Sequence, residues 1–573
     1  MKTIKYYIFS LLILLGVSSC SDFLEKRPTE LTPEVFFNDD DEAKLFLIGV
    51  YSPLMQEYFY GNNYAYTIAG GDDLGFYQRS TPVSGGSMLC ANASSTTTDI
   101  SNYWRVLYDG INRANMLLEG IENNSNITEE GYKNIRAEAL FLRAFYYFNL
   151  VQGWGDVPFR LKSTKSALDA YVPKTDKQVI YDQIISEIKE VLPDLPKFTD
   201  EESSARVTQS AAQGILARIY MFRTGEHFRD KKTADDQKIK EYWEQVHYWT
   251  NEIIKSNIHS LSPSFKQVFL DYAQDGYNTS AKETIWEVVM AGNRITSLEY
   301  SAGRIGNTIG FGSKNDYSAV LSIKEETGMR NPGYSYRFIY ATTKLYKMYE
   351  RHKDTERGDW SIAPYEYTLG TDANKLVVGR EYFYGKRPAG ETEVEGMPST
   401  ELSADKSKSL TRSAAKYRRE HERVTPKNKN YTPINFPILR YSDVLLMHAE
   451  ALNELGKTEE AISYIDQVRE RAKAVSLRDP EESFDLSRDG VKQIIKDERA
   501  MELCFEGIRR WDLIRWGEFY KTMRAMIPLT AEADWGSYPA AAAEYYKVTE
   551  AYVYFPIPDT EISGNPIAQN PGW

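Results

Sequence analysis

The chain has 573 residues, with 69 Lys and Arg against 81 Asp and Glu, and its formal net charge is −12. This acidic balance argues against binding to nucleic acid or to anionic membrane surfaces. Three cysteines are too few for a disulfide framework, so packed side chains must hold the fold, in two lobes or in one lobe with long insertions.

Residues 1–19 are typical of a secretory signal peptide. Lys2 and Lys5 precede the apolar run Tyr6–Val17, which as a helix spans about 18 Å and is too short to cross a hydrocarbon core of roughly 30 Å. Small residues and then Cys20 follow, a pattern that resembles a bacterial lipobox. We therefore expect Cys20 to be lipidated and to begin the mature chain; the alternative is an ordinary signal with an incidental cysteine.

Residues 20–37 are interpreted as a tether and residues 38–259 as a helical region. Asn38 is the expected cap of the first helix, and the acidic residues after it lack the spacing and the Gly of a calcium loop. A Gly-, Ser- and Thr-rich loop is expected over Ile68–Thr98. Apolar periodicity then predicts two helices, over 103–121 and over 135–152.

The stretch "LLMHAEALNELGKTEEAISYIDQVRERA" predicts a helical hairpin of the tetratricopeptide type. Its small and apolar residues recur at the spacing of two closely packed antiparallel helices, with a glycine at the turn: Ala449, Leu452, Gly456, Ala461, Ile465 and Val468. Residues 211–222 and 242–254 look like a degenerate second copy with a charged insert between them. Several stacked hairpins would form a helical scaffold.

Residues 260–430 lose this periodicity and are interpreted as an irregular, ligand-facing lobe, followed by a C-terminal region over 431–573 that contains the hairpin. The charged segment 494–517 is interpreted as a helix whose arginines brace neighbouring carboxylates and stack on Trp511 and Trp516. Cys90 and Cys504 are expected to form one disulfide bond or to remain buried thiols.

No pattern of catalytic or metal-binding residues stands out. None of the six His lies two to four residues from another, no Cys-x-x-Cys occurs, and no two carboxylates are singled out as a glycosidase pair. The sequence therefore predicts a protein that is not an enzyme and needs no cofactor or transition metal. The sequence leaves open whether a structural calcium ion is bound.

Six segments in order resemble the SusD/RagB family of outer-membrane nutrient-binding lipoproteins. They are Cys20 with "SDFLEKRPTE", "YWRVLYDGINRAN", "RAEALFLRAFYYFNLVQGWGDVPF", "ILRYSDVLLMHAEALNELG", "ERAMELCFEGIRRWDLIRWG" and "YFPIPDTEISGNPIAQNPGW". The resemblance implies a mainly α fold of about four tetratricopeptide-like hairpins with an irregular second lobe. It also implies an exterior-facing, lipid-anchored protein that captures a glycan for a TonB-dependent, SusC-like barrel transporter.

In starch-binding relatives, sugar rings stack on aromatic side chains while hydroxyls pair with polar groups. The resemblance places matching polar candidates in "GGDDLGFYQRS" and beyond it: Asp72, Asp73, Tyr77, Arg79 and Asn92. The loop before the Trp104 helix, "VSGGSMLCANASSTTT", contains no aromatic residue, which favours a polymer other than starch. Stacking residues are then expected from the irregular lobe, with four candidates: Tyr300, Phe311, Tyr317 and Trp360.

Three alternatives stay open. Within the family, the missing aromatic residues favour a peptide-binding protein as the main rival. Outside it, the hairpins also fit a scaffold that binds another protein, and the many carboxylates also fit a surface hydrolase.

Overall fold

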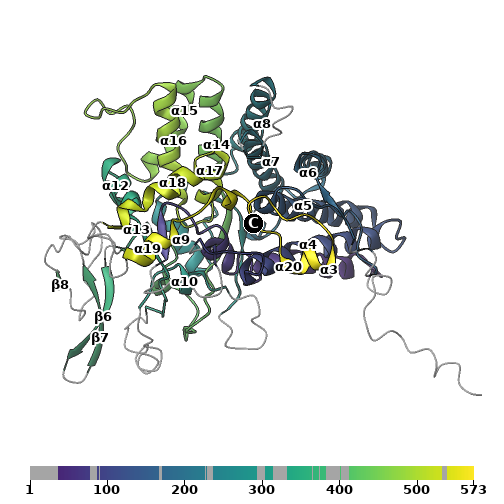
Figure 1. Cartoon of the computed structure of the whole chain (residues 1–573), viewed down its shortest axis with the longest axis horizontal. Helices are drawn as coiled ribbons and strands as arrows, with labels where there is room; N and C mark the ends of the chain where they lie inside the picture. Colours follow the sequence, from purple (N-terminus) through teal and green to yellow (C-terminus); the bar gives the residue numbers. More distant parts are fainter. Residues whose placement is uncertain are drawn as a thin grey trace, which may run out of the picture.

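The computed structural model describes residues 37–77, 87–88, 91–166, 169, 171–199, 201–225, 227–228, 236–292, 303–313, 332–363, 365–372, 375–382, 400–401, 412–531 and 539–573. The mainly α-helical fold predicted from the sequence is confirmed (Figure 1). Within the described part, no helix is both long and apolar enough to span a bilayer. Cys20, Arg79, Cys90, Tyr300 and Tyr317 lie outside the described residues.

The N-terminal helices pack against one another in chain order. They are α3 (Asp40–Met55), α4 (Thr98–Ile121), α5 (Glu129–Trp154) and α6 (Lys177–Val191). The cap of α3 is Asp39, whose side chain accepts a hydrogen bond from the Glu42 amide, whereas the expected cap Asn38 donates to the Glu42 carboxylate. The last eighteen residues of α5 are almost entirely buried, so this helix forms the centre of the N-terminal packing.

Two helical hairpins match those read from the sequence. The first joins α7 (Gln209–Thr224) to α8 (Asp236–Lys255), and the second joins α14 (Tyr441–Glu454) to α15 (Thr458–Arg471). Gly456 makes the second turn with φ of 79°, a conformation that favours glycine. Helix α16 (Arg488–Leu503) packs beside this hairpin, and the three helices stand together at the top of Figure 1.

The region between the hairpins contains short helices and paired strands. The helices are α9 (Phe265–Gln274), α10 (Ile305–Thr308), α12 (Thr343–Arg351) and α13 (Thr355–Ser361). Strand β4 (Thr284–Val288) pairs antiparallel with β9 (Phe436–Arg440), and β1 (Gly75–Tyr77) with β5 (Ile339–Ala341). The remaining strands are β2 (Val157–Pro158) with β3 (Lys174–Thr175), and the sheet of β6 (Tyr365–Asp372), β7 (Lys375–Tyr382) and β8 (Thr400–Glu401). Long-range pairs such as β1 with β5 attach this irregular region to the helical scaffold.

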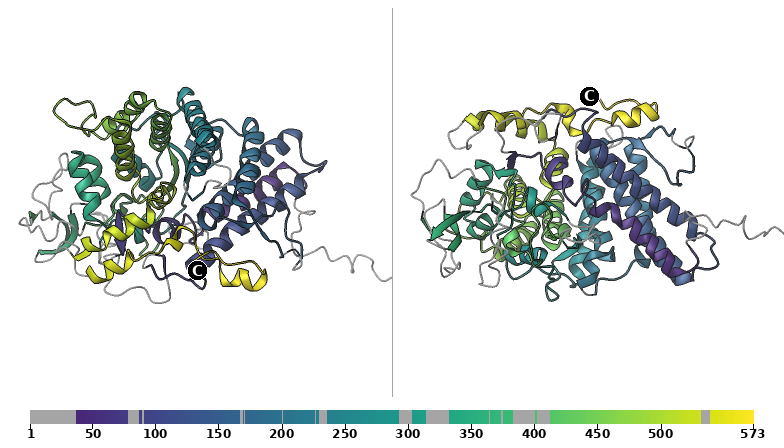
Figure 2. Two further views of the ribbon diagram at one scale, coloured as in Figure 1. Left: turned by 45° about the horizontal axis from the view of Figure 1, so that its top comes forward. Right: turned by 90° about the horizontal axis from the view of Figure 1, so that it is seen from below.

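The C-terminal region returns to the N-terminal helices. Its elements are α17 (Arg509–Arg515), α18 (Phe519–Met526), α19 (Pro539–Tyr545) and α20 (Asp559–Gly564). The Trp154 indole donates to the Pro556 carbonyl at 2.9 Å, and the Asn570 amide donates to the Trp154 carbonyl at 3.0 Å. Figure 2 shows these C-terminal elements, in yellow, along one side of the molecule. The end of the described chain is therefore bonded to the end of α5.

A large group of buried ion pairs, here called the buried charge network, joins the irregular region to the C-terminal helices. Its members are Glu283, Asp354, Arg357, Lys416, Arg440, Arg469, Arg471, Glu498, Glu502 and Glu506. Arg357 has no exposed surface and contacts Glu502 at 2.9 Å. Each charge has an oppositely charged partner, as burial requires.

The charged segment 494–517 braces the fold as expected. Arg499 bonds Asp512 and Asp443 at 2.8 Å each, and the Arg515 guanidinium lies 4.7 Å from the centre of the Trp516 ring. These contacts confirm the bracing role, but the segment is two helices, α16 and α17, separated at residues 504–508, where Phe505 and Gly507 have positive φ, and not the single helix that was expected. Cys504 is a buried free thiol.

Candidate functional site

Residues 334–338 form an irregular segment, with φ of 48° at Arg337, in which half-buried aromatic side chains alternate with buried polar ones. Tyr334, Tyr336 and Phe338 are half-buried, whereas Ser335 and Arg337 between them are 0% and 2% exposed. Apolar side chains ordinarily occupy the inner face of a segment. Here the aromatic rings lie on the outer face and polar side chains on the inner one, which makes this segment a candidate binding surface.

The three rings join two others to form what we call the aromatic cluster: Tyr66, Tyr77, Tyr334, Tyr336 and Phe338. The Phe338 ring stacks on Tyr336, with centroids 5.0 Å apart and planes 3° apart, and also on Tyr66 at 5.2 Å. Tyr77 lies 5.7 Å from Phe338, and Tyr334 meets Tyr336 edge to face at 4.9 Å. All five rings are half-buried, so their outer edges form one amphipathic surface.

Backbone hydrogen bonds hold the segment in place. The amides of Tyr336 and Phe338 donate to the carbonyls of Asn307 and Thr308 at 2.8 Å each, and these two residues belong to α10. The buried Ser335 hydroxyl donates to the Asn307 carbonyl at 3.0 Å. The rings therefore extend from a fixed backbone, which lowers the entropic cost of ligand contact.

Asp72 and Asp73 anchor the strand that carries Tyr77. Asp72 accepts hydrogen bonds from the amides of Leu74 at 2.8 Å and Gly75 at 3.3 Å. Asp73 accepts two bonds from the Arg509 guanidinium, at 2.8 and 3.0 Å, and pairs with Lys344. Both carboxylates are buried, at 6% and 0% exposed. In this structure they position β1, and Asp73 has no surface to offer a ligand.

The two carboxylates have opposite pKa shifts. Burial raises the pKa of Asp72 to about 7, and the adjacent Asp73 carboxylate adds to the rise. Burial alone would also raise the pKa of Asp73, but the cations of Arg509 and Lys344 overcome this effect and hold it well below its usual range. The pair therefore has one carboxyl that is fully ionised and one that titrates near neutrality.

The other predicted site residues differ in their placement. Tyr77 belongs to the aromatic cluster, and Asn92 is exposed, with its side chain accepting a hydrogen bond from the Ser87 amide at 2.8 Å. Phe311 is 1% exposed and Trp360 is 5% exposed. The Arg418 guanidinium covers the Trp360 ring at 4.1 Å and also lies 5.9 Å from the Phe311 ring, so both rings pack internally. The structure places neither on a ligand-facing surface.

Of the five rings of the aromatic cluster, Tyr77 is among the residues predicted from the sequence, and the other four are not: Tyr66, Tyr334, Tyr336 and Phe338. The available signal was "YSYRF", where aromatic residues alternate with Ser and Arg. Residues of the described chain form no cluster of three or more His, Cys, Asp or Glu that could hold a metal ion. The question of structural calcium stays open.

Comparison with known families places this chain. A family model described as "SusD family" matches residues 282–573, and one described as "Starch-binding associating with outer membrane" matches residues 22–221. The chain belongs to the SusD family. The resemblance stated from its sequence motifs is thereby confirmed.

Individual relatives match nearly the whole chain of this SusD-family protein. SusD-like protein P25 of Formosa agariphila is 26% identical, with 99% of this chain and 97% of the relative covered. A SusD homolog of Bacteroides thetaiotaomicron has a solved structure that superimposes with a TM-score of 0.78 at 24% identity, covering 94% of this chain and 98% of that one. Surface glycan-binding protein A of Bacteroides thetaiotaomicron, solved in complex with laminarihexaose, superimposes with a TM-score of 0.63 at 18% identity, covering 93% and 99%. At these identities the two structures establish the shared fold.

Proposed function

We propose that this protein is a surface-exposed, lipid-anchored glycan-binding protein of the outer membrane. It captures an oligosaccharide or polysaccharide and delivers it, without breaking bonds, to a TonB-dependent, SusC-like barrel transporter. Family membership supports this role, as do the description "Starch-binding associating with outer membrane" and the laminarihexaose complex of a structural relative.

The observation that carries the proposal is the aromatic cluster. Sugar rings have apolar C–H faces and a rim of hydroxyls, and they pack well against half-exposed tyrosines, which offer an apolar ring and a polar tip. The Tyr336 hydroxyl has no hydrogen-bond partner among the described residues. Tyr336 and Phe338 are therefore the proposed central contacts, with Tyr77 beside them and Asn92 as a further polar contact.

Binding of the purified mature chain to a panel of soluble polysaccharides and peptides tests the proposal. We expect measurable affinity for at least one polysaccharide in calorimetry or affinity electrophoresis. The double variant Tyr336→Ala/Phe338→Ala should weaken that binding by at least tenfold, since it removes two apolar ring surfaces from the contact, each Å² of buried apolar surface contributes about 25 cal/mol, and about 1.4 kcal/mol corresponds to tenfold.

Tyr171→Ala is the matched control, because Tyr171 is an exposed tyrosine, 62% accessible, outside the cluster. Affinity for peptides alone would instead identify the peptide-binding alternative. Release of reducing ends from the bound polysaccharide would contradict the non-catalytic role. Full glycan affinity in the double variant would show that the site lies elsewhere.

The lipid anchor is tested separately. Mass spectrometry of the mature protein should find acyl chains on Cys20, and Cys20→Ala should release the protein from the membrane fraction. An unmodified Cys20 at the processed N-terminus would contradict the anchor but leave glycan binding untouched. Co-purification of a barrel transporter with the anchored protein tests the proposed partner.

A further inference from the structure

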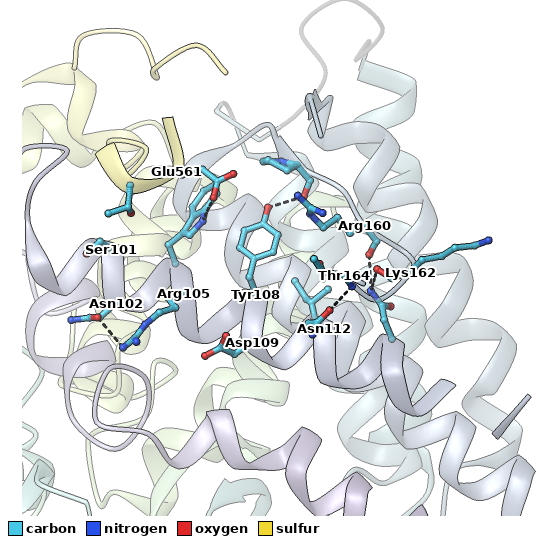
Figure 3. A pocket seen from close by; sticks show the side chains of 15 residues that line it. Ser101, Asn102, Arg105, Tyr108, Asp109, Asn112, Arg160, Lys162, Thr164 and Glu561 are labelled. Atoms are coloured by element: carbon cyan, nitrogen blue, oxygen red, sulfur yellow. Dashed lines mark hydrogen bonds between the residues drawn. The ribbon is translucent and has the colours of Figure 1, made fainter. Parts of the chain in front are cut away.

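A second cavity follows the outer side of α4, separate from the aromatic cluster. This α4 groove has a volume of about 510 Å³, within the usual range of small-molecule sites. Its walls come from α4, from the segment 158–164 and from the first turn of α20. Figure 3 shows Asn102, Arg105, Tyr108 and Asp109 along α4, with Glu561 at one side of the cavity and Arg160 at the other.

The floor of the α4 groove is apolar and rigid. The Trp104 and Tyr108 rings lie 5.0 Å apart, and the Trp104 indole donates to the Glu561 carboxylate at 3.3 Å. The Tyr108 hydroxyl donates to the Pro158 carbonyl at 2.7 Å. These bonds connect all three walls, so the floor keeps its shape without a ligand.

The rim, in contrast, has unused polar groups. The exposed Asp109 carboxylate has no hydrogen bond or ion pair among the described residues, and neither has the Thr560 hydroxyl. Arg105 is exposed, and within the described part of the chain its side chain donates one hydrogen bond, to the Asn102 carbonyl oxygen at 3.0 Å, which leaves most of its donors and the Asn102 NH2 group unused. Asn102, Arg105 and Asp109 are spaced three and four residues apart and therefore share one side of α4.

We infer that the α4 groove is a second binding site for a neutral oligosaccharide. This inference rests on the proposed glycan-binding function and adds a site to it. Planar carboxylate, amide and guanidinium groups can each bond two adjacent hydroxyls, while the half-buried Tyr108 ring packs against a sugar face. The α4 helix links this groove to the aromatic cluster, because Asp99 in its first turn accepts a hydrogen bond at 3.1 Å from Asn63, the cap of the turn that carries Tyr66.

The charges of the groove favour a neutral sugar over other ligands. The lining contains the carboxylates of Asp109 and Glu561 and the cations of Arg105, Arg160 and Lys162, so a strongly charged ligand of either sign would meet like charges as well as opposite ones. Sugar hydroxyls both donate and accept hydrogen bonds and can satisfy both kinds of group. A peptide would instead need deep apolar pockets or an open strand edge, and the groove is a shallow channel beside a helix.

Native mass spectrometry and calorimetry with laminarihexaose, maltohexaose, cellohexaose and xylohexaose test the inference. For at least one of these probes we expect two molecules per chain. Asn102→Ala/Asp109→Ala should remove one of them, with affinity at that site at least tenfold weaker, and should leave the cluster site intact. Glu130→Ala is the matched control, because Glu130 is exposed on α5 outside the groove.

The outcomes separate this site from the proposed function. One molecule per chain, lost in Tyr336→Ala/Phe338→Ala and kept in the α4 variant, would overturn the second site and uphold the cluster. One molecule lost only in the α4 variant would uphold the groove and overturn the cluster assignment. Absence of binding by all four probes to the wild-type chain would overturn the groove as a site for these sugars, while the wider polysaccharide panel still decides the proposed function. Circular dichroism and thermal unfolding of both variants check that they are folded.

Discussion

The buried charge network and the aromatic cluster each place side chains opposite to the usual rule. Charged side chains lie in the interior in the network, and aromatic side chains lie at the surface in the cluster. In the network, charges such as Arg357 and Glu502 have no exposed surface, and in the cluster, aromatic rings remain half-exposed. In the network, each charge meets a counter-charge. The five rings of the cluster are half-buried. Buried charges that are all paired with opposite charges stabilise the fold, whereas half-buried aromatic rings on an outer face can bind a ligand.

The strongest test of this comparison removes one charge from the network. Arg357→Ala leaves the carboxylates of Asp354, Glu498 and Glu502 buried with less compensation, and we expect the free energy of unfolding to fall by about 3–5 kcal/mol. Urea or thermal denaturation measures the change. The control is Arg351→Ala, whose side chain is 62% exposed beside Asp497 and should matter by less than about 1 kcal/mol. Equal effects of the two variants would break the comparison.

Substitutions at Tyr336 test whether the aromatic cluster binds a ligand or stabilises the fold. Tyr336→Ala should weaken glycan binding by about tenfold, while Tyr336→Phe, which keeps the ring, should cost less, because it removes only the hydroxyl. Both should leave the unfolding midpoint within a few degrees of wild type, since the ring is half-exposed. A large loss of stability with unchanged binding would assign Tyr336 to architecture.

The carboxyl pair behind the cluster predicts a dependence of stability on pH. Burial raises the folded-state pKa of Asp72 from 3.8 to about 7, so between these values the folded chain binds more protons than the unfolded chain. The contribution of Asp72 to stability is therefore present below about pH 4 and is lost as the pH rises to about 7. Asp72→Asn should flatten this decline, as measured by denaturation at pH 4, 5.5 and 7. An unchanged slope would show that other groups, such as Glu287, cause it.

Substitutions of two glycines outside both regions should change the free energy of unfolding least, and they show how much backbone preference alone contributes. A Cβ added at Gly49 in α3 or at Gly456 would have no other atom within 4 Å, but of these two glycines only Gly456 has positive φ. Gly49→Ala should stabilise the chain by about 0.5–1 kcal/mol, and Gly456→Ala should destabilise it by about 1–2 kcal/mol. Thermal unfolding measures both. The same sign for both variants would mean that local backbone preference does not govern these positions.

The helical scaffold was largely predictable from the sequence, because helices and helical hairpins depend on residues that are close together in the chain. Small residues and a turn glycine at fixed spacing identified the α14–α15 hairpin, and Ala449, Ala461 and Ile465 are indeed buried. The site was less predictable. Whether Trp360 faces a ligand or the interior depends on Arg418, which lies 58 positions away in the chain. The spacing of residues in the sequence does not predict that Arg418 covers Trp360. The alternation of aromatic and polar residues around Tyr336 can be read from the sequence.

The bonds between α5 and the residues near the C-terminus constrain the order in which the molecule is assembled. Trp154 and Asn570 are separated by 416 positions, so the ribosome completes the rest of the scaffold before the partner of Trp154 exists. Contacts of such sequence separation form late and slowly. The N-terminal helices therefore lack the contacts of Pro556 and Asn570 with Trp154 until the C-terminal residues have been synthesised.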